Sequence, residues 1–151
     1  MPYVVRGSET LRNQFENEMQ VGNTVTCPGF YAPQGRELRL PIRFPQLLED
    51  LNYYHKGEFW LTNFEMETSA YYAFGRLLGH EVLSANAIIA NRIKNKFAKD
   101  PNKVVESLIK KVLDRIWDYP IFSNKLSRRT HALHAHNVLA GCIGIGIVKA
   151  R

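Results

Sequence analysis

The sequence predicts an α/β fold with a largely parallel sheet. Segments with the pattern of strands and of helices alternate from about residue 24 to residue 117, and such alternation is typical of parallel sheets joined by helices. Residues 81–90 are almost continuously apolar, as expected for a strand that is covered on both faces. Only three strands are found in this way, whereas most sheets have about four to six. We therefore expect a sheet that is incomplete by itself or that is completed by assembly.

The first 45 residues predict a helix, a short strand and a loop. Ser8 can cap a helix whose apolar residues recur at helical spacing, and Gly22 can end it. Residues 23–31, NTVTCPGFY, form a short strand that ends in a Pro-Gly pair. Residues 32–45 are predicted to be a loop because prolines and a glycine interrupt them repeatedly.

Three helices and a strand are predicted farther along the chain. Residues 45–55 form a short helix with a proline in its first turn. Residues 58–64, EFWLTNF, form a strand, and residues 67–79 form a helix that ends at a glycine. The last helix starts after Asp100 with a proline. Its apolar residues lie on or near one face: Val104, Val105, Leu108, Val112, Leu113 and Ile116.

The composition fits one ordinary domain. The chain has 151 residues, of which 45% are hydrophobic and 23% charged. No apolar run approaches the roughly 20 residues that span a bilayer, and the N-terminus lacks the order of a signal peptide. We therefore expect a cytoplasmic protein with no membrane partner, and Cys27 and Cys142 fit reduced thiols.

Residues 118–151 differ from the rest and are expected to form a basic tail of unknown structure. They carry five Lys/Arg and one acid, whereas residues 1–117 carry 15 and 13. A solvated basic tail is commoner than a nucleic-acid site, so nucleic acid is not an expected partner. Three histidines, His131, His134 and His136, have loose ligand spacing, but no Cys or acid cluster accompanies them. No metal site is predicted, and the Gly-rich run in this tail lacks the lysine of a phosphate loop.

The run NFEMETSA, residues 63–70, admits two interpretations. Asn63 can cap the following helix, Glu65 and Glu67 favour its positive end, and Met66 fills the core. In open α/β sheets, however, ligands bind at the carboxyl ends of strands. A carboxylate at that place can accept hydrogen bonds from two neighbouring hydroxyls, as on a ribose.

The run GFYAPQGRELR also admits two interpretations. It can be a Pro/Gly loop with exposed arginines. It can also be a planar recognition set, in which Phe30 stacks on a ring while Gln34 and Arg36 offer amide groups and a donor fork. A pyrimidine edge, with two carbonyls and an N–H between them, matches that set.

The run NAIIANR, residues 86–92, has apolar residues in its middle and two polar residues at its end. Ile88, Ile89 and Ala90 can be sheet core or the wall of a ligand site. Asn91 and Arg92 are expected to close the strand at the same end of the sheet as the two acids of NFEMETSA.

Together, in this order and spacing, GFYAPQGR, NFEMETSA and AIIANR resemble the nucleoside phosphorylase family, and within it the uridine phosphorylases. The resemblance covers about residues 2–117. The Glu-Met-Glu segment is shared widely in the family, and its combination with Gln-x-Arg is fairly specific for uracil. The resemblance implies the C-terminal portion of the family's mixed sheet, flanked by helices and incomplete. The family's first strands and the Gly-rich phosphate loop of its N-terminal half have no counterpart here.

The resemblance also implies a role for each matching residue. The residues that bind the base are Phe30, Gln34, Arg36, Ile89, Ala90 and Arg92. The residues that bind the ribose are Glu65, Met66 and Glu67. Arg36 and Glu67 are the catalytic pair, because the base departs as an anion while positive charge develops on the sugar.

The implied reaction is phosphorolysis, in which phosphate and a nucleoside give ribose 1-phosphate and a free base. It needs no cofactor beyond phosphate as co-substrate. Purine-cleaving relatives place an Asp just past the later strand, and its absence from ANRIKN favours a pyrimidine.

Three hypotheses about function stay open at this point. The first is a truncated or split uridine phosphorylase-like protein with base and ribose residues but no phosphate residues. The second is a non-catalytic fragment or an oligomerisation partner, and the third is a nucleic-acid binder that uses the basic tail. An incomplete fold would expose strand edges such as residues 82–90, so we expect a homo-oligomer or pairing with a separate N-terminal piece.

Overall fold

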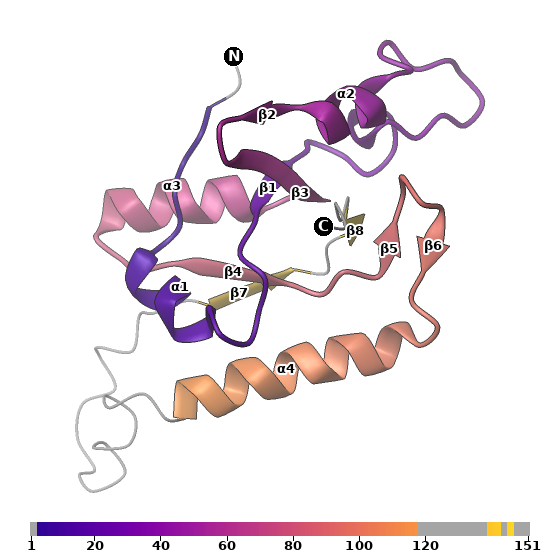
Figure 1. Cartoon of the computed structure of the whole chain (residues 1–151). Helices are drawn as coiled ribbons and strands as arrows, with labels where there is room; N and C mark the ends of the chain where they lie inside the picture. The colour runs from indigo at the N-terminus through magenta and orange to yellow at the C-terminus, as the bar shows by residue number, and fades with distance from the viewer. Residues whose placement is uncertain (1–2, 118–138, 143–144, 147–151) are drawn as a thin grey trace, which may run out of the picture.

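The computed structural model describes residues 3–117, 139–142 and 145–146 (Figure 1). These residues form a mixed α/β fold with four α-helices and eight strands in two sheets. The α/β class predicted from the sequence is confirmed. The expectation of a largely parallel sheet is wrong, because parallel and antiparallel pairs occur together.

The larger sheet has six strands. Its order is β1 (Asn23–Thr26), β3 (Phe59–Glu65), β8 (Ile145–Gly146), β5 (Ala90–Asn91) and β6 (Lys96–Phe97), with β2 (His55–Lys56) paired to β3. β1 is parallel to β3 and β5 is parallel to β8, whereas β3–β8, β2–β3 and β5–β6 are antiparallel. Each antiparallel pair includes a strand of two residues, which is too short to show the alternation of apolar and polar residues that identifies a strand in a sequence.

The smaller sheet pairs β4 (Leu83–Asn86) with β7 (Leu139–Cys142) in parallel. The single strand predicted over residues 81–90 is therefore divided, because residues 87–89 are irregular and β4 and β5 belong to different sheets. β7 and β8 come from residues 118–151, so parts of the predicted tail take part in both sheets. In Figure 1, α3 (Thr68–Leu78) lies above the β4–β7 pair and α4 (Pro101–Trp117) lies below it.

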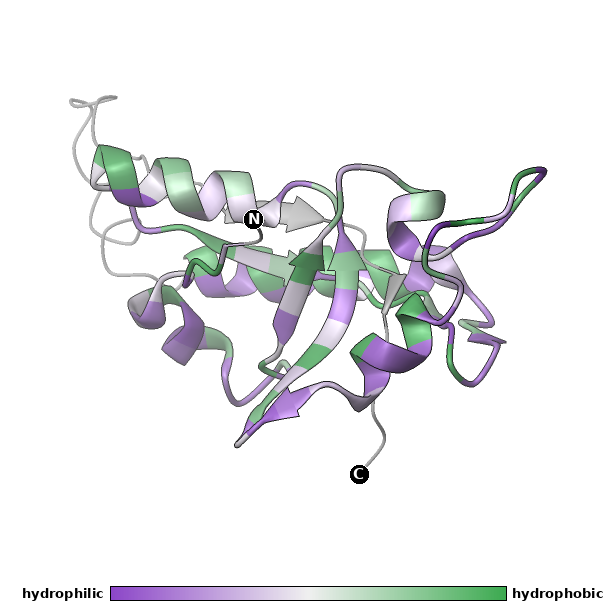
Figure 2. Ribbon diagram, turned by 90° about the horizontal axis from the view of Figure 1, so that it is seen from above, coloured by the Kyte–Doolittle hydropathy of each residue, from purple (hydrophilic) through white to green (hydrophobic). Residues whose placement is uncertain are grey.

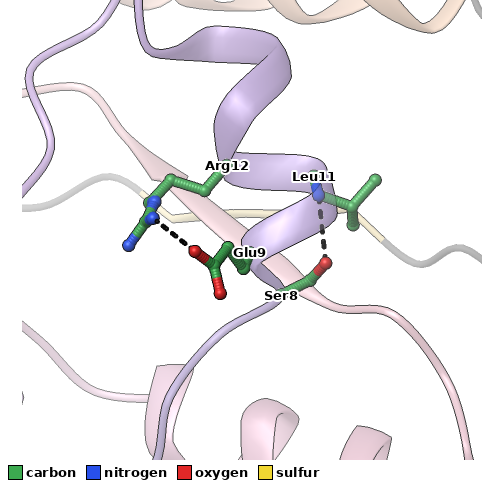
Figure 3. Close-up of polar contacts among 4 residues, drawn as sticks. All are labelled: Ser8, Glu9, Leu11 and Arg12. Carbon is green, nitrogen blue, oxygen red and sulfur yellow. Dashed lines mark hydrogen bonds and ion pairs between the residues drawn. The ribbon is translucent and has the colours of Figure 1, made fainter.

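The first helix, α1 (Glu9–Phe15), begins at the predicted cap. The Ser8 hydroxyl accepts the N–H of Leu11 at 3.0 Å (Figure 3). Figure 3 also shows the exposed ion pair between Arg12 and Glu9, which contributes little to stability. The helix ends at Phe15, earlier than the predicted Gly22, since the next residues form a turn.

The other predicted helices are present. They are α2 (Leu47–Tyr53), α3, which ends at Gly79 with a φ of 72°, and α4, where the Asp100 carboxylate accepts the N–H of Lys103. Most of the predicted apolar face of α4 is half-buried, whereas Leu113 is 58% exposed. Among the described helices, none combines the length and the apolar character needed to cross a bilayer.

The buried centre that supports the site lies where β1 runs into the following loop beside β3. Phe64 is 1% exposed and packs with Cys27, and Val25, Leu48 and Leu51 surround the two. Burying an aromatic ring of this kind contributes about 3–5 kcal/mol, judged from the cost of its removal. Figure 2 shows the loop after this region, residues 36–46, extending from the body with alternating hydrophobic and hydrophilic residues.

Candidate functional site

A pocket of about 180 Å³ lies at the carboxyl ends of β1 and β3. All three sequence motifs contribute to its walls. Its lining residues are Phe30, Gln34, Phe64, Glu65, Met66, Glu67 and Ile89. It is smaller than the clefts of about 300–1,000 Å³ that hold drug-sized ligands. This pocket is therefore a small and open recess.

The parallel pairing of β1 and β3 brings two of the motifs together. Thr26 pairs with Glu65, and the N–H of Cys27 donates to the carbonyl of Glu65 at 2.8 Å. Beyond β1 the chain turns into a 3₁₀ helix, Ala32–Gln34, which carries Gln34 to the pocket. Beyond β3 it passes into α3. Because β1 and β3 are parallel neighbours, their carboxyl ends meet at one edge of the sheet, where ligands of open α/β sheets bind.

The third motif reaches the pocket differently from the prediction. β8 is antiparallel to β3 and parallel to β5, so β5 runs opposite to β3. The prediction that Asn91 and Arg92 close their strand at the same end of the sheet as the two acids is therefore wrong. Ile89, the residue just before β5, lines the pocket. Ala90, the first residue of β5, is buried and does not line it.

The Gln34–Gly35 turn is held by Arg92. The two terminal nitrogens of Arg92 donate to the backbone carbonyls of Gln34 and Gly35, the second at 3.2 Å. Gly35 has a φ of 69°, a conformation that favours glycine. Gln34 is only 3% exposed although it lines the pocket. Arg92 thus fixes the backbone of the turn that carries the Gln34 amide.

Arg36 lies beside the same turn and covers Phe30. Its Nη1 donates to the Phe30 carbonyl at 2.5 Å and to Gln34 Oε1 at 2.6 Å. Its guanidinium carbon lies 3.8 Å from the centroid of the Phe30 ring, a cation–π geometry. The edge of the ring meets Tyr31, with centroids 5.3 Å apart. Arg36 therefore orders both the aromatic ring and the Gln34 amide.

The two guanidinium groups keep their positive charge in a partly desolvated place. Burial lowers the pKa of Arg36, and burial followed by the charge of Arg36 lowers the pKa of Arg92. Arginine stays protonated at neutral pH despite such shifts. Among the described residues, neither group forms an ion pair with a carboxylate. Their hydrogen bonds to protein go to neutral oxygens, so the charge is left to act on a ligand.

Both oxygens of the Glu65 carboxylate accept hydrogen bonds from the chain itself. One oxygen accepts the hydroxyl of Thr26 at 2.5 Å. The other accepts the backbone N–H groups of Glu67 at 2.5 Å and Thr68 at 2.6 Å. The prediction that Asn63 caps α3 is wrong, because Asn63 lies inside β3 and accepts the hydroxyls of two threonines. Glu65 satisfies the start of the helix in its place.

Glu67 and Met66 are exposed, unlike the buried Glu65. Glu67 is exposed, lines the pocket, and its carboxylate takes no hydrogen bond that the described residues provide. Met66 is 43% exposed, so the alternative that it is core filler is wrong. The turn therefore offers one free carboxylate and one apolar side chain to the pocket.

Thr26, Cys27 and Phe64 were not predicted as site residues from the sequence. The hydroxyl of Thr26 at a strand end was the one available signal. Burial, and then the charge of Glu65, raises the pKa of Cys27 to about 11, while the charges of Arg36 and Arg92 oppose this. The thiol is therefore neutral at physiological pH and is a packing residue, not a nucleophile.

Comparison of the chain with protein-family models, with curated proteins and with solved structures found no match. Within residues 3–116, no group of three His, Cys, Asp or Glu side chains could hold a metal ion. The three histidines with loose metal-ligand spacing in the sequence lie outside the described residues; they are His131, His134 and His136.

Proposed function

We propose that this chain carries the base- and ribose-binding part of a pyrimidine nucleoside phosphorylase site of the uridine phosphorylase type. The observation that supports this most is the convergence of the three motifs on one pocket. Phe30 and Gln34 from the loop after β1 line it together with Ile89 and with the free carboxylate of Glu67 from the turn after β3, while Arg36 holds the Gln34 amide from beside the pocket. The resemblance to the C-terminal portion of the family's fold belongs to the same proposal.

The base would bind against Gln34 and Arg36. Gln34 Oε1 is already taken by Arg36, so its amide N–H₂ is the group left for a pyrimidine carbonyl. Arg36 has further N–H groups for the second carbonyl. Its charge, unpaired with any carboxylate of the described residues, would stabilise the base as it departs with negative charge.

The ribose would bind at Glu67. Its carboxylate lines the pocket and is free to accept two neighbouring hydroxyls. A negative charge beneath the sugar also favours a transition state with positive charge on the ring. Met66 would pack against the sugar from the same turn.

Phosphate would need groups from elsewhere. None of the described residues that line the pocket is basic, and Glu65 and Thr26 already take the N–H groups at the start of α3. The proposed site thus binds a nucleoside and depends on another segment or another chain for its co-substrate. A non-catalytic nucleoside-binding partner is the alternative that this same observation favours.

Calorimetry with uracil and uridine, together with an assay of uracil release from uridine and phosphate, tests the proposal. We expect the chain to bind both ligands and to release no uracil by itself. Glu67→Gln should weaken uridine binding about tenfold and leave uracil unchanged, since a hydrogen bond to a charged group is lost. Glu106→Gln, a matched change on an exposed carboxylate of α4, should change neither.

The outcomes separate the parts of the proposal. Binding of neither uracil nor uridine by the native chain would refute the proposed function. Uracil release by the chain alone would leave nucleoside binding intact and overturn the claim that its phosphate groups come from elsewhere.

A further inference from the structure

We infer that Glu65 and Thr26 are positioning residues that hold Glu67 in place for a ribose, an inference that rests on the proposed function. Both lie at the end of their strands, β3 and β1, and they are directly paired in the sheet. Neither needs to touch the ligand to act in this way. Each acts through the backbone of the turn that carries Glu67.

The hydrogen bonds at the start of α3 form a closed set. The Glu65 carboxylate accepts the N–H of Glu67 and the N–H of Thr68. The hydroxyl of Thr26 donates to Glu65 and accepts the N–H of Ser69 at 3.0 Å. Three successive N–H groups of the helix start are thus satisfied by two side chains. A negative charge at this end also suits the helix dipole.

In this arrangement the carboxylates of Glu65 and Glu67 have different roles. Glu65 is 3% exposed, and rotating it toward a ligand would leave two backbone N–H groups without their acceptor. Glu67 is exposed and has no such bond in the described part of the chain. Glu65 therefore fixes the backbone, and Glu67 is left to meet the hydroxyls. A turn whose backbone is already fixed loses less entropy when its side chain binds a ligand.

Two threonines on β1 allow a matched experiment. Thr26 donates to Glu65, whereas Thr24, two residues earlier, donates to Asn63 Oδ1 at 2.8 Å. Thr26→Val and Thr24→Val each remove one hydroxyl from a half-buried strand position. Only the first change touches the turn of Glu67. A general loss of stability would affect both variants alike.

The affinity for uridine is measured against the affinity for uracil in both variants by calorimetry. We expect Thr26→Val to lower the uridine affinity about tenfold relative to uracil, and Thr24→Val to leave that ratio within about twofold. Glu65→Gln, which keeps the shape and one acceptor oxygen, should fall between the two. Equal ratios in Thr26→Val and Thr24→Val would overturn the inference.

Amide hydrogen exchange, followed by NMR, measures in the absence of ligand how firmly the backbone of the Glu67 turn is held. The amides of Glu67, Thr68 and Ser69 should exchange about tenfold faster in Thr26→Val than in Thr24→Val. Equal exchange in the two variants would overturn the positioning role. If the native chain binds neither uracil nor uridine, the proposed function fails, while this measurement still decides whether Glu65 and Thr26 hold the turn.

Discussion

Arg92→Lys is the sharpest test of how the base side of the pocket is built. Arg92 is half-buried and donates from both terminal nitrogens to two successive backbone carbonyls, those of Gln34 and Gly35. A lysine keeps the charge but presents a single ammonium on a flexible stem, so it cannot span both carbonyls with a fixed fork. One of the two bonds is therefore lost.

The size of the effect follows from that bond. A hydrogen bond to a charged donor contributes about 1.5–3 kcal/mol, and we take the lower end because Arg92 is only half-buried. A loss of about 1.5 kcal/mol corresponds to roughly tenfold in an equilibrium constant. The turn that carries the Gln34 amide would then be correctly placed for a smaller fraction of the time, and uracil affinity would fall by up to that factor.

Calorimetry with uracil and a thermal melt of each variant measure this. Arg39→Lys is the control, because Arg39 is an exposed arginine of the same loop. We expect uracil to bind Arg92→Lys up to about tenfold more weakly, and to bind Arg39→Lys as it binds the native chain. Native uracil affinity in Arg92→Lys would refute the assignment of a clamping role to this side chain.

Two further predictions concern the buried centre beneath the pocket. Phe64→Ala should destabilise the fold by about 3–5 kcal/mol in urea denaturation, whereas Phe44→Ala, at a ring that is 59% exposed, should cost under about 0.5 kcal/mol; similar midpoints would contradict the packing described. The folded state keeps the Cys27 proton up to its raised pKa of about 11, and the unfolded state loses it near 9.0. Stability should therefore fall by roughly 2–3 kcal/mol as pH rises through this window, and Cys27→Ala should lack that share of the loss. Equal pH slopes in the native chain and Cys27→Ala would count against the buried thiol.

Features that depend on a few neighbouring residues could be predicted from the sequence. The cap at Ser8, the glycine end at Gly79 and the start at Asp100 each rest on side chains within four residues of the helix end. The chemistry of these positions is local, so the pattern of residue types carries it.

Features that depend on distant residues could not be predicted in the same way. The helix start of α3 looked like an Asn63 cap, but its acceptor is Glu65, which is held by Thr26 from 39 positions earlier. Likewise, the direction of β5 depends on pairing with β8, which only the folded chain defines. All the residues that line the pocket belong to the three motifs, but Arg36, Ala90 and Arg92 of the same motifs do not line it, because sheet and turn pairing decides which side chains face the pocket.

The position of β8 between β3 and β5 has a consequence for how the chain folds during synthesis. Residues 145–146 are the only link between the part of the described sheet built on β3 and the part built on β5. β3 and β5 are both synthesised before β8, so they cannot be joined through β8 until the ribosome has completed the intervening residues. Pairings between residues so far apart in sequence slow folding, because a long loop must close before they form. The helices can form early, but the two parts of the described sheet can join only after residues 145–146 have been synthesised.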